Sequence, residues 1–356
     1  MRSQAKREVA IIATAQAPSE AYTSKTTVEL LVPVVTEVLA RAGMQRSDIG
    51  FWCHGSCDYM SGQPFSFVAA VDALGAWPPI SESHVEADGA FALYEAWIKI
   101  QTGECNTALA FSNGKSSAGP IAKIMAYQLD PYTVAPLGPD MHAVAALAAR
   151  VCLETGVVSE RAMAEVVSRS LAAAVGNPAA LRKGTVSIDE LLNRPRTYDP
   201  LREHDCPPVT DGANAVILAA GDVARSLCER PAWIVGIDHR IANQRFNLVS
   251  MTQAESAANA GDRAGVGNDR IDFAELHAPY SHQELLLTAA LGLDATRVTV
   301  NPSGGALCAN PQMAAGLARF AEAAERIMRG DADRGVAHCT SGPNLQQNLV
   351  AVLEGN

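Results

Sequence analysis

The segment Val300-Asn301-Pro302-Ser303-Gly304-Gly305-Ala306-Leu307-Cys308-Ala309-Asn310-Pro311 is the most informative part of this 356-residue chain. Asn-Pro-Ser-Gly-Gly makes a rigid turn whose backbone amides can face a ligand. An ordinary surface turn can have the same composition. However, a long irregular stretch leads here into an Ala-rich helix from about residue 312, and small side chains permit close approach. This combination favours a binding site.

A second turn of interest lies upstream, in the segment IDFAELHAPYSHQE at residues 271–284. A buried strand ends at Leu276, and Ser281 and Glu284 have the spacing of a capping box that begins a helix. His277 and Tyr280 therefore fall in a turn at the carboxyl end of a strand, where open α/β sheets bind ligands. The plainer alternative is a core histidine beside a packing ring.

Apolar strands and amphipathic helices alternate along the chain in two series. The first series predicts strands at 9–15, 49–53, 83–86, 107–112 and 211–218, with helices at 28–42, 65–74, 88–101, 141–155 and 159–175. The second predicts strands at 233–238, 271–276, 335–340 and 348–353, with helices at 251–264, 282–291 and 312–329. This pattern indicates an α/β protein of two similar halves, residues 1–225 and 226–356, whose mixed sheets are covered on both faces.

Composition limits the class of protein. Hydrophobic residues make up 48% of the chain and charged residues 19%, as in a folded protein. The net charge of −10 argues against a broad nucleic-acid surface, and no apolar run is long enough to span a membrane. Eight scattered cysteines predict reduced thiols and a cytoplasmic location. The segment Cys53-His54-Gly55-Ser56-Cys57 resembles half of a metal site, but no second Cys/His pair follows at ligand spacing, so we expect no bound metal.

Four segments, taken together, resemble thiolases, in particular the sterol-carrier-type thiolases and the bacterial lipid-transfer proteins. They are DGANA at 211–215, ELHAPY at 275–280, VNPSGGA at 300–306 and GVAHCTSG at 335–342, and they span most of the chain in the family's order. The resemblance implies a five-layered αβαβα sandwich of two similar halves, usually dimeric. It also implies coenzyme A as part of a thioester substrate, with no tightly bound cofactor.

The departures from the family pattern concern the reacting groups. The family's Cys-Ala-Ser-Gly corresponds to Glu86-Ala87-Asp88-Gly89, so a glutamate replaces the cysteine that accepts the acyl group. The family's Gly-His-Pro corresponds to Ala309-Asn310-Pro311, so the histidine that activates the thiolate is absent as well. Covalent catalysis needs a nucleophile and an activating base, and the loss of both indicates different chemistry.

The remaining polar residues suit retro-aldol cleavage of a β-hydroxyacyl thioester. A base removes the hydroxyl proton, the carbon–carbon bond breaks, and donors stabilise the enolate oxygen. We expect Tyr280 or Glu86 as the base and His277 at the oxyanion, while Asp88 is either a second acid–base group or a helix-start residue. The expected substrate-binding residues are Asn301, Gly304, Gly305, Asn310, His338 and Cys339.

The segments at 50–59 and 113–119 resemble the lipid-transfer branch that is similar to aldolases of bacterial steroid side-chain degradation. This resemblance implies a steroid acyl-CoA substrate. It also implies two partners: a second thiolase-like chain, the same or different, and a small protein of oligosaccharide/oligonucleotide-barrel type. Lys115 is a further candidate site residue, although a solvated loop lysine is the favoured interpretation.

Two alternatives stay open. The chain is either a non-catalytic subunit of a heteromeric aldolase, or an acyl-CoA thiolase or acyltransferase that uses Cys308 or Cys339. The aldolase prediction requires turnover without an acyl-enzyme. A cysteine thiol poised beside a histidine in the pocket would overturn it.

Overall fold

A computed structural model of the chain describes residues 7–243 and 246–355. Its strands are β1 Val9–Gln16, β2 Phe51–Ser56, β3 Glu82–Glu86, β4 Thr107–Lys115, β5 Arg196–Tyr198, β6 Leu201–Arg202, β7 Asp211–Ala220, β8 Ala232–Ile241, β9 Phe273–Leu276, β10 Thr299–Val300, β11 Arg334–Ser341 and β12 Gln347–Glu354. Its helices are α1 Thr27–Ala42, α2 Asp58–Ser61, α3 Phe67–Leu74, α4 Gly89–Thr102, α5 Ile121–Met125, α6 Met141–Glu154, α7 Glu160–Ala173, α8 Ile188–Asn193, α9 Gly221–Leu227, α10 Leu248–Thr252, α11 Glu255–Ala264, α12 Ser281–Ala290 and α13 Ala315–Met328.

Ten of the strands form two five-stranded halves that meet at one short seam. The first half has the order β3-β2-β4-β7-β1 and the second has the order β8-β12-β11-β9-β10. Strands β1 and β8 join them through two residue pairs, Ala10 with Trp233 and Ile11 with Ala232. Both halves mix parallel and antiparallel pairs, as alternating strands and helices require.

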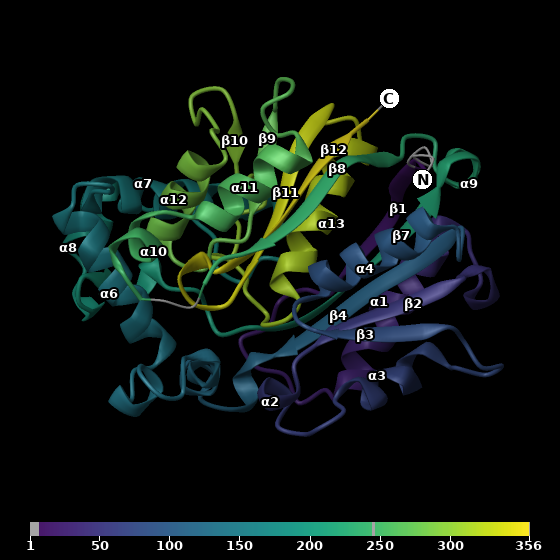
Figure 1. The fold of residues 1–356 in the computed structure, drawn as a ribbon, viewed down its shortest axis with the longest axis horizontal. Helices are drawn as coiled ribbons and strands as arrows, with labels where there is room; N and C mark the ends of the chain where they lie inside the picture. Colours follow the sequence, from purple (N-terminus) through teal and green to yellow (C-terminus); the bar gives the residue numbers. More distant parts are fainter. Residues whose placement is uncertain (1–6, 244–245, 356) are drawn as a thin grey trace.

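The two halves face each other across a central layer made of α4 and α13 (Figure 1). Apolar residues of both helices and of both half-sheets form one core cluster, which includes Leu93, Ile100, Phe320 and Ile327. Helices α1 and α3 cover the outer face of the first half-sheet, and α11 and α12 cover the second. The predicted five-layered αβαβα sandwich is therefore confirmed.

Most of the expected elements are present, although several begin or end at other residues. The helix expected at 251–264 is two helices, because Gln253 has extended backbone after α10. The last helix begins at Ala315 instead of residue 312, since Met313 has a positive φ of 68° that no α-helix contains. Strand β2 covers Phe51–Ser56 instead of 49–53.

Helix α12 begins at the expected residue but is capped differently. Tyr280 occupies the cap position, and its backbone N–H donates to Gln283 Oε1 at 3.3 Å. Ser281 instead donates from its hydroxyl to Asp205 Oδ1 at 2.6 Å, and Glu284 accepts from Asn301 Nδ2 at 2.6 Å. The predicted Ser281–Glu284 capping box was wrong because both side chains have buried tertiary partners.

The segment between β4 and β7 packs mainly against the second half of the sequence. Helix α7 lies against α12 and helix α6 lies against α10, so this insertion covers the carboxyl ends of β9 and β11. The division of the chain into 1–225 and 226–356 stays a prediction.

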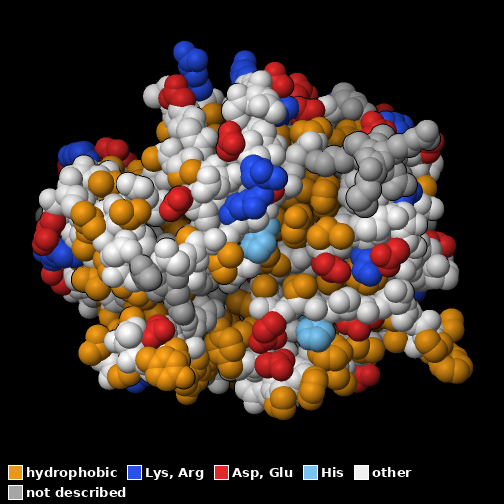
Figure 2. Space-filling model, in the orientation of Figure 1, with side chains coloured by type: hydrophobic (Ala, Val, Ile, Leu, Met, Phe, Trp, Pro, Cys, Tyr) orange, Lys and Arg blue, Asp and Glu red, His pale blue; other side chains and the backbone are white. Residues whose placement is uncertain are grey.

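On the face in Figure 2, Lys and Arg side chains lie singly or in small groups among acidic ones. Within residues 7–243 and 246–355, no helix combines the length and the apolar character needed to cross a bilayer.

Candidate active site

A large cavity lies between the second half-sheet and residues 121–145 of the segment between β4 and β7. It holds about 960 Å³ of space between atoms, a volume suited to a small-molecule ligand. Four of the predicted site residues line it: Asp88, His277, Tyr280 and Asn310. The other lining groups include His142, Ser116, Gln312, Met313, Thr340 and the segment Ser341–Leu345.

Asp88 lies at the junction of the two central helices. It is the cap residue of α4, and its carboxylate accepts hydrogen bonds from Ala90 N at 2.9 Å and from Gly316 N and Leu317 N, both at 2.8 Å. Burial raises the pKa of this carboxyl, while the three amides lower it. The helix-start alternative for Asp88 is what the structure shows, although the residue also lies at the cavity wall.

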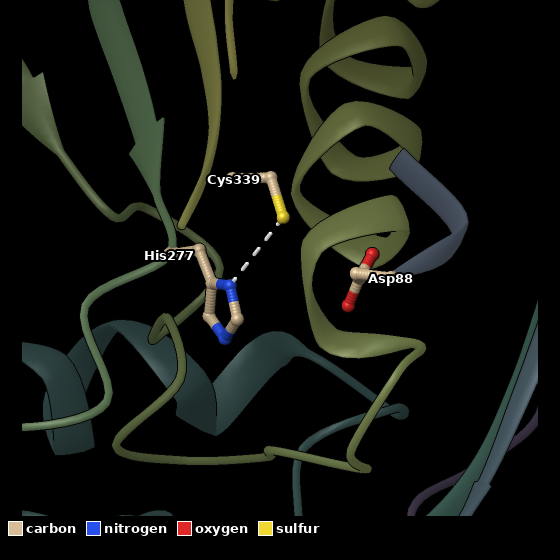
Figure 3. A group of neighbouring side chains, drawn as sticks. All are labelled: Asp88, His277 and Cys339. Carbon is tan, nitrogen blue, oxygen red and sulfur yellow. Dashed lines mark hydrogen bonds between the residues drawn. The ribbon is translucent and has the colours of Figure 1, made fainter. Parts of the chain in front are cut away.

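His277 follows β9 and touches two candidate residues at once. Its Nε2 lies 3.1 Å from Asn310 Oδ1. Its Nδ1 lies 3.7 Å from Cys339 Sγ, and a dashed line marks this contact in Figure 3. Because Asn310 Oδ1 can only accept, Nε2 carries the ring proton and Nδ1 is free to accept from the thiol. Burial lowers the pKa of His277 to about 4, so the ring is neutral at pH 7.

The pair formed by Cys339 and His277 is the arrangement that would overturn the aldolase prediction if the thiol lay in the pocket. Cys339 is on β11, which pairs with β9, and that pairing brings the two residues together. The thiol is fully buried and is not part of the cavity lining. Burial and the neighbouring Asp88 carboxyl raise its pKa well above the usual range, so the sulfur stays protonated.

Tyr280 and His142 form a second polar pair at the cavity wall. The Tyr280 hydroxyl lies 3.1 Å from His142 Nδ1 and 3.3 Å from the Met141 carbonyl oxygen. Burial raises the pKa of Tyr280 well above 10, and burial lowers the pKa of His142 against the opposing effect of Asp140. The phenol is therefore protonated and the imidazole is neutral, so His142 can accept the proton that Tyr280 gives up.

Asn310 presents a free donor to the cavity. Its side chain is 1% exposed, and its Oδ1 is taken by His277. Its Nδ2 has no hydrogen-bond partner among the described residues. A buried amide N–H without a partner is costly, so this group is suited to an oxygen atom of a ligand.

Glu86 was expected in the site but lies outside it. Its side chain is exposed at the end of the edge strand β3, and its Oε1 accepts a hydrogen bond from Asp58 N at 2.6 Å. It does not line the cavity, whereas Asp88, two residues later, does. Glu86 is the last residue of β3, whereas Asp88 lies after the strand as the cap residue of α4, so the two carboxyls point in different directions, which the sequence did not show.

Four of the expected substrate-binding residues lie behind the cavity wall and do not line the cavity. Asn301 accepts from Leu276 N at 2.7 Å and donates to Glu284, while Gly304 and Gly305 have positive φ in a buried turn. His338 Nε2 donates to Asn348 Oδ1, 2.8 Å away, on the far side of β11. None of the four is in the lining of the large cavity.

Two further candidates from the sequence, Cys308 and Lys115, lie outside the lining of the large cavity. Cys308 points to the Ser170 carbonyl oxygen at 3.3 Å, away from the cavity. Lys115 donates to the Lys25 carbonyl oxygen at 2.7 Å and lines an adjoining pocket.

Within the described ranges, Asp88, His277 and Cys339 are the one group whose ligand-type atoms, all within 4.8 Å of one another, could share a metal ion. The geometry does not favour this use. Asp88 already accepts three backbone amides, and the amino-terminal ends of α4 and α13 favour an anion at this point.

Sequence reasoning missed His142, Ser116 and the strained segment around Asn344 and Leu345. His142 is the second residue of a helix whose cap, Asp140, is a recognisable start signal, but nothing in its local sequence indicates a partner. Asn344, Leu345 and Met313 have φ values of 52°, 56° and 68°, and all three line the cavity. Such backbone strain concentrates at functional sites and is invisible in the sequence.

No family model matches the chain. It is 31% identical over 219 residues to an acetyl-CoA acetyltransferase of Methanothermobacter thermautotrophicus, an alignment that covers 55% of this chain and 56% of that protein. It is 28% identical over 297 residues to sterol carrier protein 2 of Homo sapiens, which covers 72% of this chain and 54% of that protein. The chain thus spans about half the length of these curated relatives.

Two solved structures share the fold over almost their whole length. The Ltp2-ChsH2(DUF35) aldolase superposes with a TM-score of 0.80 at 18% identity, over 98% of this chain and 97% of that chain. Human mitochondrial 3-ketoacyl-CoA thiolase superposes with a TM-score of 0.78 at 15% identity, over 98% of this chain and 99% of that chain.

Proposed function

Because this chain belongs to the thiolase superfamily, we propose that it is a carbon–carbon lyase that cleaves a β-hydroxyacyl-CoA by a retro-aldol step. The observation that carries the proposal is the cavity itself. It combines a free amide donor, Asn310, with the Tyr280–His142 proton pair, and it holds no exposed thiol. A retro-aldol step needs an oxyanion donor and a proton-transfer group but no nucleophile, whereas an acyl-enzyme also needs a nucleophile that the substrate can reach.

The proton pair supplies the base. Tyr280 takes the proton of the substrate's β-hydroxyl as its own proton passes to His142 Nδ1, 3.1 Å away. The β-carbon becomes a ketone or aldehyde, and the bond between the α- and β-carbons breaks. Its electron pair forms the thioester enolate. This assignment makes Tyr280 the base, working through His142, and leaves Glu86 out of the chemistry.

The enolate oxygen is stabilised by Asn310. Its Nδ2 donates to the oxygen, while His277 fixes the amide from the other side through Nε2. Donors placed in a site that excludes water contribute far more than they would in solution. The proton held on the Tyr280–His142 pair then returns to the α-carbon, which completes a shorter acyl-CoA and restores both residues.

The proposed substrate is the coenzyme A thioester of a steroid side chain, and the proposed assembly is a hetero-oligomer. The lipid-transfer resemblance at 50–59 and 113–119, the sterol carrier protein relatives and the aldolase fold neighbour support both. We propose as partners a second thiolase-like chain and a small barrel protein. Exposed apolar side chains such as Phe65 and Trp77, which are 70% and 88% exposed, give such partners a surface.

The test is direct. The purified chain, alone and with each co-purified partner, is incubated with a steroidal β-hydroxyacyl-CoA, and the released ketone or aldehyde is measured by mass spectrometry. Release that depends on Tyr280 in this chain supports the proposal. Release that persists after substitution of Tyr280, His142 and Asn310 assigns the chemistry to a partner and makes this chain a non-catalytic subunit.

Acyl transfer is the second candidate, and the 3.7 Å contact between Cys339 Sγ and His277 Nδ1 favours it. The curated relatives include an acetyl-CoA acetyltransferase, and an imidazole acceptor beside a thiol is how such a nucleophile is activated. Against it stand the raised pKa of Cys339 and its complete burial. Incubation with acetyl-CoA followed by peptide mass mapping separates the two candidates, since only acyl transfer leaves an acetyl group on Cys339.

A further inference from the structure

A second pocket adjoins the candidate active site at the carboxyl ends of β2 and β4. It holds about 670 Å³ of space between atoms. Four residues, Ser116, Ile121, Gln312 and Met313, line both this pocket and the large cavity, so the two form one continuous surface. Nothing in the proposed reaction uses this second space.

His54 is the residue of this pocket whose buried polar atoms lack a partner and could bind a ligand. It lies on β2 at 2% exposure and stacks on Phe111, with ring centroids 4.7 Å apart. Both ring nitrogens are buried, and neither has a hydrogen-bond partner among the described residues. Asn113 is a polar neighbour that opposes the effect of burial on the pKa of His54, but no hydrogen bond of normal geometry joins them.

A hydroxyl chain beside His54 adds a second polar group. Ser66 Oγ lies 2.9 Å from Asp58 Oδ1 and 3.2 Å from Ser56 Oγ. Because a carboxylate only accepts, the proton of Ser66 points to Asp58, and Ser56 donates to Ser66. The lone pairs of Ser56 Oγ are then left for a donor in the pocket, and both serines are only 5% exposed.

The charge state of His54 selects the kind of ligand. Burial lowers its pKa to about 3, so the ring is neutral and offers one N–H donor and one acceptor. Hydrogen bonds from Ser66 and Phe65 lower the pKa of Asp58, so its carboxylate is ionised and repels a second anion. A hydroxyl can accept from the N–H of His54 and donate to Ser56 Oγ.

We propose that this pocket, through His54 and Ser56, binds a hydroxyl group carried by the acyl part of the substrate, remote from the thioester. The inference rests on the proposed function, because it assumes that a coenzyme A thioester occupies the adjoining cavity. It makes the preferred substrate a hydroxylated acyl-CoA instead of a plain alkyl one.

Equilibrium binding tests the site without relying on turnover. Isothermal titration compares three matched series of coenzyme A thioesters of graded chain length, ending in a methyl, a hydroxyl or a carboxylate group. At the chain length that reaches the pocket, we expect the hydroxyl compound to bind about tenfold more tightly than the methyl compound, as one buried hydrogen-bond pair allows.

The variant His54→Phe keeps a flat ring on Phe111 and removes both nitrogens, so it should abolish the tenfold preference and leave binding of the methyl series unchanged. His84→Phe is the matched control, because His84 pairs with His54 across β2 and β3 but does not line the pocket. Circular dichroism verifies folding, and Ser56→Ala, expected to reduce the preference, replaces His54→Phe if that variant does not fold.

Three results would overturn the inference. These are equal binding of the methyl and hydroxyl series at every length, a preference that survives in His54→Phe, or tighter binding of the carboxylate series. The first means that the pocket holds water only. A chain that binds no thioester of any series contradicts the proposed function as well, whereas hydroxyl preference without lyase activity contradicts the proposed function alone.

Discussion

The environment of Cys339 decides what its sulfur can do. The residue has a histidine within reach, as a nucleophilic cysteine requires, but it also has the buried Asp88 carboxyl on its other side. A negative charge next to a thiol opposes the thiolate, and burial opposes it further. The sulfur is therefore held as a thiol, a form that is unsuited to covalent attack.

Tyr280→Phe is expected to lower kcat for retro-aldol cleavage by about a hundredfold to ten-thousandfold, the usual contribution of a positioned acid–base group. The ring and its packing stay, while the proton path to His142 is lost. The released ketone or aldehyde is the measured product. Tyr198→Phe is the control, since Tyr198 stacks on His142 but does not line the cavity, and it should change kcat little. Equal effects of the two variants would remove Tyr280 from the mechanism.

Asn310→Ala is expected to reduce kcat by about a hundredfold to a thousandfold, because it deletes the donor proposed for the enolate oxygen. Substrate affinity, measured by titration with a non-cleavable thioester, should fall much less, since the oxygen becomes an anion only during the reaction. Gln312→Ala alters a neighbouring cavity residue and serves as the comparison. A loss confined to affinity would show that Asn310 only binds the ground state.

The pH dependence of kcat/KM follows from His142. It must be neutral to accept the proton of Tyr280, and burial lowers its pKa below the ordinary value. Activity should therefore be constant through neutral pH and fall only as the pH drops below about 6.5, the unperturbed value for histidine. A rate profile measured with the purified protein checks this. An acid limb that begins above neutrality would contradict the assignment.

At the scale of elements, the amino-terminal ends of α4 and α13 meet at Asp88. One carboxylate bonds the amides of both helices, so two elements far apart in the sequence share a cap. A helix start leaves amide groups without partners, and a buried carboxylate satisfies several of them. The close approach needs a residue without a side chain at Gly316, where an added Cβ would collide with Cys339 Sγ and Asp88.

Gly316→Ala is accordingly expected to destabilise the protein by about 1–3 kcal/mol, the usual cost of overpacking a filled site. Chemical denaturation monitored by circular dichroism measures the free energy of unfolding. Gly176→Ala is the matched control, because an added Cβ at Gly176 meets nothing within 4 Å. A smaller loss for Gly316→Ala than for Gly176→Ala would mean that the junction is loosely packed.

At the scale of the whole molecule, four fully buried histidines tie stability to pH. Burial lowers the pKa of His54, His282 and His338 to about 3 and that of His277 to about 4. Each histidine is neutral in the folded chain and binds a proton on unfolding when the pH is below about 6.5. Each therefore contributes stability that is present above that pH and is lost as the pH falls. The carboxyls Asp88, Glu275 and Glu284, whose pKa values are raised, oppose this trend.

His282→Leu removes one of these groups while filling a similar buried space. Between about pH 4 and 6, the free energy of unfolding of this variant should change with pH by about 1.4 kcal/mol per unit less steeply than in the parent chain. Urea unfolding at several pH values measures the two slopes. Parallel slopes would show that His282 is already protonated in the folded chain or accessible to water.

The placement of the cavity is also a property of the whole molecule. The insertion at 121–206 belongs to the first series of elements but covers the second half-sheet, so the site takes residues from both halves. His142 and Tyr280, 138 positions apart, meet there only because α6 lies across the start of α12.

The sequence by itself determined the alternation of strands and helices and the turn that holds His277 and Tyr280, since both depend on local periodicity and on turn residues. The five layers were implied by the resemblance to thiolases. The tertiary structure alone decided that Asp88 and not Glu86 faces the cavity, that Asn301, Gly304, Gly305 and His338 support the site from behind, and that Cys339 lies beside His277. The direction of a side chain at a strand end and the pairing of distant strands depend on packing across the layers, and no local pattern of residues records them.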